Sequence, residues 1–229
     1  MKKLITAILV LIVFIANAQK SEKRVIESFD KLDVYGNIEV EMVLSDTESI
    51  DIFTTNVDPS EVNTEIEDKL LKIKMKSNLF DDDVKVQIIL KYKEIREITA
   101  NAAAEVIVKN VIKGDKLFAT ATSGGRIKMQ VELNAIDLKS YQGSHIDISG
   151  KTILQESFVN TGGVLAGPDF SSDEVFIKMN TGGKAEIIVN KSLEANVNTG
   201  ASLNYFGTPE KENIKTNLGG KINAWDKKE

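Results

Sequence analysis

Along the second half of the chain, apolar and polar residues alternate in short runs that restart after a pair of small residues. The first members of these pairs are Gly124, Gly143, Gly162, Gly182, Gly200 and Gly219, so successive pairs lie 18 to 20 residues apart. The third residue after each of these glycines is apolar in every copy: Ile127, Ile146, Leu165, Ala185, Leu203 and Ile222. The fifth residue is apolar in most copies and the fourth is mostly polar, an alternation typical of a half-buried strand. The chain therefore contains a structural repeat of about 19 residues.

In the later copies of the repeat, a residue typical of turns precedes the pair of small residues. Asparagine stands two positions before the first glycine in each of these copies. Asparagine tolerates left-handed backbone and can hydrogen-bond within a turn, while paired glycines allow positive φ and close packing. We predict structural corners at Asn160, Gly162, Gly163, Asn180, Gly182, Gly183, Asn198, Gly200, Asn217, Gly219 and Gly220. The asparagine side chains are expected to stack into a ladder.

A second alternating segment precedes each corner, as in Val175 to Met179. Each repeat therefore holds at least two strands joined by a corner, and successive repeats would stack at the sheet spacing of about 4.8 Å. The predicted fold is all-β, a parallel β-solenoid with turns of about 19 residues. Between Ile153 and Val159, Gln155 and Ser157 stand where apolar residues are expected, which predicts a bulge or a register shift.

The chain before residue 101 follows a less regular pattern. Short strand-like segments are separated by turn residues and are expected at 29–34, 36–44, 49–54, 70–76 and 84–92. We expect residues 19–100 to form irregular N-terminal β strands of the same body as the regular repeats at 101–229. Trp225 and the charged residues after it would form a C-terminal cap. The alternatives are a separate small sandwich at 19–100 and a helix from Pro59 to Lys72.

The first eighteen residues differ from the rest of the chain. Lys2 and Lys3 precede an apolar run from Leu4 to Ala16, and Ala16 and Ala18 supply the small-x-small pattern of a signal-peptidase site. As a helix this run rises only about 20 Å, less than the ~30 Å hydrocarbon layer of a bilayer. Residues 1–18 are therefore predicted to be a signal peptide, with no transmembrane segment left after cleavage.

Composition narrows the range of partners and chemistry. The chain carries 29 Lys and Arg against 34 Asp and Glu, for a net charge of −5, with both signs interspersed. Nucleic acid and anionic membranes select a concentrated basic face, so neither is expected as a partner. The sequence contains no cysteine, which excludes disulfides, thiol catalysis and zinc–thiolate sites.

Several short motifs coincide along the chain: FDKLDV at 29–34, GNIEV at 36–40, LKIK at 71–74 and NTGG at 160–163 and 180–183. Together they resemble the head GIN domain family of auto-transporter adhesins, exported proteins of Bacteroidetes-type bacteria, over about residues 29–225. The resemblance implies a right-handed, single-stranded parallel β-helix exported to the periplasm or cell surface of a Gram-negative bacterium. It also implies a non-catalytic role in adhesion or ligand binding, and it offers no catalytic residues.

One outward-facing column of the repeat carries aromatic and acidic side chains. It lies six residues before each first glycine and comprises Phe118, Asp137, Glu156, Phe176, Glu194 and Asn213. Carboxylates beside aromatic rings suit a ligand-binding face, with a glycan, a lipid or an envelope protein as the alternative partners. No regular arrangement of lysine or arginine is evident beside this column in the sequence.

Two other functions remain open. Asp137 and Glu156 on adjacent turns could act as the paired acids of a polysaccharide-active enzyme, and exposed strand edges at the ends of the solenoid could drive self-assembly. The single histidine, His145, has only Asp147 nearby in the sequence, and Asp81 to Asp83 match no calcium-loop spacing. We therefore predict no enzyme activity, no cofactor and no metal.

Overall fold

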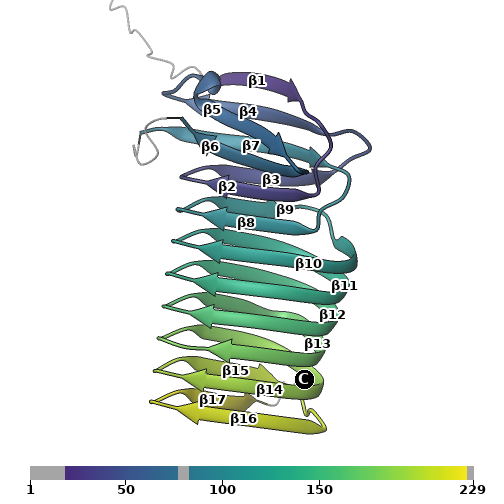
Figure 1. Cartoon of the computed structure of the whole chain (residues 1–229), viewed down its shortest axis with the longest axis vertical. Helices are drawn as coiled ribbons and strands as arrows, with labels where there is room; N and C mark the ends of the chain where they lie inside the picture. Colours follow the sequence, from purple (N-terminus) through teal and green to yellow (C-terminus); the bar gives the residue numbers. More distant parts are fainter. Residues whose placement is uncertain (1–18, 77–82, 226–229) are drawn as a thin grey trace, which may run out of the picture.

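The computed structural model describes residues 19–76 and 83–225, so the predicted signal peptide lies outside the described residues. The strands of the described residues form one continuous 17-stranded sheet that winds into a rod (Figure 1). Most neighbouring strands pair in parallel, and each coil stacks on the next along the rod axis. The predicted all-β solenoid is confirmed.

Four long strands make the regular part of the rod, and each spans one complete turn between two corners. They are β11 (Arg126–Tyr141), β12 (His145–Asn160), β13 (Val164–Met179) and β14 (Lys184–Asn198). The coil before them ends in β10 (Ile112–Thr122), and the coils after them are split into β15 (Ser202–Phe206), β16 (Lys211–Asn217) and β17 (Lys221–Trp225). Each long strand bends near its middle, so that every coil contributes to two opposed faces (Figure 1).

The core consists of the alternate side chains that point into the coil. The residue three positions after each corner glycine is aligned from coil to coil, with Ile127 beside Ile146, Ile146 beside Leu165, and Leu203 beside Ile222. Nearly all of these side chains are buried, while the residues between them face solvent. Burial of apolar area at about 25 cal/mol per Å² is the main term that holds such a rod together.

The corners are four-residue turns with two left-handed residues at their centre. In the corner at 160–163, the Gly163 amide donates to the Asn160 carbonyl at 2.9 Å, and φ is 47° at Thr161 and 71° at Gly162. The left-handed pair is thus the threonine and the first glycine, not the asparagine or the second glycine. Gly163 is needed for another reason, because a Cβ there would lie 2.1 Å from the Ser140 carbonyl oxygen of the preceding coil.

The asparagine side chains form a ladder in the later coils. Asn198 Nδ2 donates to Asn180 Oδ1, and Asn217 Nδ2 donates to Asn198 Oδ1, both at 3.2 Å. Asn160 does not join this ladder, since its Oδ1 accepts from the adjacent Thr161 amide at 2.8 Å. The ladder links successive corners through side chains, in addition to the backbone hydrogen bonds between the turns.

The bulge predicted at 153–159 is not present, and that prediction was wrong. This part of β12 keeps an unbroken register with β11, and the register shifts lie instead after Ala166 in β13 and between Val189 and Ser192 in β14. Gln155 and Ser157 point inward as a buried polar cluster: Gln155 Nε2 donates to Ser157 Oγ at 2.8 Å, and Ser172 Oγ donates to Gln155 Oε1 at 2.7 Å. Because these groups satisfy one another, the strand keeps its regular geometry.

The N-terminal strands belong to the same sheet but do not follow the rod in chain order. The strands β2 (Lys31–Tyr35) and β3 (Glu39–Leu44) form a coil, with β8 (Glu97–Asn101) and β9 (Glu105–Val108) in parallel on one side. On the other side lie β6 (Leu70–Met75) and β7 (Lys85–Tyr92), also in parallel. The chain between residues 45 and 96 is therefore an excursion that covers the end of the rod before the regular coils begin.

Antiparallel strands complete this end of the rod. The strands β1 (Lys20–Val25) and β7 flank β4 (Ser49–Thr55), and β5 (Val62–Glu67) pairs with β6. The helical alternative at 59–72 was wrong, because only a short 3-10 turn at Pro59–Glu61 precedes β5. At the opposite end, Trp225 is 55% exposed and residues 226–229 lie outside the described residues, so the C-terminal cap stays a prediction.

Candidate functional site

The acidic and aromatic side chains predicted to share one outward column lie in register along the rod. Phe118 pairs with Asp137, Asp137 with Glu156, Glu156 with Phe176, Phe176 with Glu194, and Glu194 with Asn213. We call these six residues the acidic column. Its members come from six successive coils, and parallel hydrogen bonding between those coils holds them at the strand spacing.

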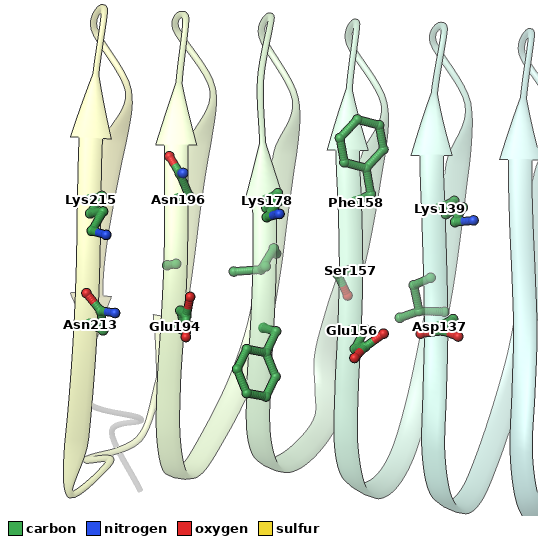
Figure 2. A pocket seen from close by; sticks show the side chains of 14 residues that line it. Asp137, Lys139, Glu156, Ser157, Phe158, Lys178, Glu194, Asn196, Asn213 and Lys215 are labelled. Atoms are coloured by element: carbon green, nitrogen blue, oxygen red, sulfur yellow. The ribbon is translucent and has the colours of Figure 1, made fainter.

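A second column, which the sequence reading missed, runs beside the first. Two residues further along each strand lie Lys139, Phe158, Lys178, Asn196 and Lys215, which we call the basic column (Figure 2). The expectation that no regular arrangement of lysine accompanies the acidic column was therefore wrong. The signal was available, since three of these five positions are lysine at one fixed offset from the corner glycines.

The two columns line an open groove on this face of the solenoid (Figure 2). The groove has a volume of about 420 Å³ and extends from Asp137 in β11 to Lys215 in β16. A smaller hollow of about 140 Å³ lies beside Phe118 and shares Asp137 and Lys139 with the groove. A ligand in the groove would meet carboxylates along one side and ammonium groups along the other.

Asp137 and Glu156 form a carboxyl pair at the edge of the groove. The hydrogen bond with Asp137, reinforced by repulsion between the two charges, raises the pKa of Glu156. Lys116 opposes this repulsion, with its Nζ 2.9 Å from Asp137 Oδ2. Carboxyl groups in hydrogen-bond contact are closer together than the separation of about 5 Å or more at which paired carboxyls flank a glycosidic bond. The geometry thus disfavours the enzymatic alternative.

Aromatic rings lie on both sides of the carboxyl pair. Phe118 and Phe176 are 41% and 42% exposed, so both rings are accessible to a ligand. Lys116 Nζ lies 4.7 Å from the centroid of the Phe118 ring, a cation–π contact. Phe158, in the basic column, packs edge-on against Tyr141 at 6.4 Å between centroids.

The other residues considered as possible catalytic or metal-binding groups, His145 and the acidic turn at 81–83, do not form a comparable cluster in the described part of the chain. His145 Nε2 lies 3.1 Å from Asp147 Oδ1 on the opposite outward face of the coil. Within residues 19–76 and 83–225, no group of three or more acidic or histidine side chains is placed to hold a metal ion. Asp81 and Asp82 of the acidic turn lie outside the described residues. None of the helical segments in the described part of the chain is long and apolar enough to cross a membrane.

Comparison with known proteins gives one family match and several matches to solved structures. The family model described as "Putative auto-transporter adhesin, head GIN domain" matches residues 28–209. None of the curated protein sequences compared with this chain matches it significantly.

The similar structures share the fold at low sequence identity. One from Parabacteroides merdae, titled a putative adhesin, is 20% identical with a TM-score of 0.77, covering 92% of this chain and 97% of its own. Two from Parabacteroides distasonis are each 18% identical and cover 92% of this chain and 98% of their own. Their titles describe a putative adhesin, with a TM-score of 0.75, and a putative lipid binding protein, with a TM-score of 0.72.

Proposed function

This chain belongs to the head GIN domain family, and we propose that it is an exported, non-catalytic binding module of the bacterial cell envelope whose ligand occupies the groove. The proposed binding residues are five of the six members of the acidic column: Phe118, Asp137, Glu156, Phe176 and Glu194. Export rests on the predicted signal peptide at residues 1–18.

The observation that carries this proposal is the sorting of exposed side chains into two aligned columns around one groove. Outward positions of a solenoid need only be polar, and random charges would satisfy that requirement. Here carboxylates lie in one column and ammonium groups in the other, and two exposed rings lie within the acidic column. The long strands β11 to β14 beneath the groove are hydrogen-bonded on both sides, so little order would be lost there when a ligand binds.

The absence of a catalytic role is supported by the chemistry of the groove. A glycoside-hydrolysing site needs an acid and a base or nucleophile that flank the scissile bond, about 5 Å or more apart. Asp137 and Glu156 instead contact each other, and Lys116 already pairs with Asp137. The family description and the titles of similar structures name adhesins or a lipid-binding protein.

The experiment is to bind the mature chain, residues 19–229, to a glycan array and to cell-envelope extracts. A groove variant with Phe176→Ala and Glu194→Gln is compared with a control carrying Ile153→Ala and Glu186→Gln, which lie outside the groove lining. We expect the groove variant to lose binding and the control to keep it. Binding that survives in the groove variant refutes the site, and turnover of any polysaccharide refutes the non-catalytic role.

End-to-end assembly is a second candidate function, and one observation favours it. In the described part of the chain no strand pairs with the outer edges of β16 and β17, and Ile214 and Leu218 are exposed there. Unpaired strand edges are templates for association. Light scattering over a range of protein concentrations tests this, and a mass that stays that of one chain at every concentration excludes it.

A further inference from the structure

Beside the groove, the protein binds the ammonium group of one of its own side chains, that of Lys116, through an aromatic ring and a carboxylate. Lys116 Nζ lies over the Phe118 ring, 4.7 Å from its centroid, and 2.9 Å from Asp137 Oδ2. A ring face combined with a carboxylate is an effective receptor for a cation, because both attract positive charge and their geometries are compatible. The carboxylate in this case comes from the next coil along the rod.

The same combination recurs three coils further on, without a lysine. Phe176 has Glu156 beside it in the preceding coil and Glu194 beside it in the following coil. The position that corresponds to Lys116 is occupied by Glu174, which is exposed on the same strand as Phe176. The exposed Phe176 ring is thus surrounded by three carboxylates.

Several acidic side chains of the described residues form ion pairs, whereas these three carboxylates do not. Asp137, Glu132 and Asp173 each have a lysine within ion-pair distance. Among the ion pairs of the described residues, none involves Glu156, Glu174 or Glu194. Negative charge therefore accumulates around the exposed Phe176 ring inside the groove. The nearest lysine to Phe176 on the same strand is Lys178, which belongs to the basic column.

We infer that the groove binds a saccharide that carries a free amino group, whose ammonium lies over Phe176 between Glu156 and Glu194 as Lys116 lies over Phe118. The inference rests on the proposed function and names its ligand class. A saccharide fits better than a lipid because the groove lies on the outer surface of a packed sheet. The side chains beneath it, such as Ile177, are buried in the core and leave no channel for an acyl chain.

The basic column completes the recognition of such a ligand. Lys178 and Asn196 lie two residues beyond Phe176 and Glu194 on their strands, about 7 Å along the strand direction. Their donors can meet the hydroxyl oxygens of a sugar whose amino group lies on the acidic side. This arrangement distinguishes the two edges of the ligand and fixes its orientation in the groove.

Binding should also depend on pH. The groups that face Glu156 are Asp137, Lys116 and Phe176, with Glu194 one coil beyond. Since Asp137 raises the pKa of Glu156, acidification protonates Glu156 and removes one of the two charges offered to the ammonium group. We therefore expect the affinity to fall as the pH is lowered through that raised pKa.

The test is calorimetric titration of the mature protein with a glucosamine oligosaccharide and with its fully N-acetylated counterpart. Acetylation replaces the ammonium group with a neutral acetamido group, so we expect the N-acetylated probe to bind about tenfold or more weakly. Glu156→Gln and Glu194→Gln should each reduce the affinity for the glucosamine probe, and Phe176→Leu should do the same. Phe176→Trp should retain affinity, and Glu186→Gln, on the other face, should leave it unchanged.

The outcomes separate this inference from the proposed function. Equal affinity for the two probes, or a preference for neutral or acidic glycans that still depends on Phe176, overturns the amino-sugar inference and leaves the groove as the binding site. Binding only to phosphatidylethanolamine vesicles, with none to the oligosaccharides, overturns the choice of a saccharide. Saccharide binding that no groove variant weakens overturns both, and thermal melts of each variant establish that it is folded.

Discussion

Gly150 provides the sharpest test of how closely the coils pack. It lies within β12 between Val131 of the preceding coil and Phe170 of the following one. Its φ is +104°, and a Cβ placed there would be 2.0 Å from the Val131 carbonyl oxygen. Gly150→Ala should therefore combine backbone strain with displacement of a neighbouring strand.

The expected loss in the free energy of unfolding for Gly150→Ala is the sum of these two effects. Holding a non-glycine residue in such a conformation costs about 1–3 kcal/mol, and forcing a buried neighbour aside costs about 1–3 kcal/mol more. The expected loss in the free energy of unfolding is thus roughly 2–6 kcal/mol. Gly162→Ala is the matched control, because φ there is +71° but no atom lies within 4 Å of the added Cβ. Strain alone predicts a loss of about 1–2 kcal/mol at that position.

The assay is urea unfolding with linear extrapolation, checked for an unchanged m value so that the two variants are compared on the same transition. In a chain of this length, each kcal/mol lowers Tm by about 2–4 °C, so thermal melts should rank the variants in the same order. Equal losses for the two variants, or a smaller loss for Gly150→Ala, would refute the close approach between β11 and β12 at this position.

Three further predictions concern side chains. Ser172→Ala leaves the buried Gln155 Oε1 without its donor and should lower the free energy of unfolding by about 1–3 kcal/mol in urea titrations. Asp137 raises the pKa of Glu156 in the folded protein, so protonation of Glu156 stabilises the folded state as the pH falls, and Glu156→Gln removes this effect. The Tm of the Glu156→Gln variant should match or exceed that of the unmodified protein at neutral pH. On acidification, its Tm should gain less from this site than the Tm of the unmodified protein does. Asn198→Ala breaks the ladder to both neighbouring corners and should cost about 1–2 kcal/mol, measured by chemical denaturation.

The candidate site was only half predictable from the sequence. The acidic column was found because its members share one offset from the corner glycines, and the structure places them in register. The basic column obeys the same rule and was missed, because Phe158 and Asn196 interrupt its lysines. The contact between Lys116 and Phe118 depends on side-chain conformations, which no spacing rule encodes.

The sequence by itself determined the repeat, the corners and the inward and outward assignment of residues in the regular coils. These are local properties: strand alternation has a period of two, and the left-handed corner favours glycine. Only the tertiary structure decided that β4 to β7 leave the rod and return on the far side of β2 and β3. It also decided that Gln155 and Ser157 remain inside without a bulge. Both depend on partners distant in the chain, since any strand edge can accept several neighbours and a buried polar group is tolerated only where another coil satisfies it.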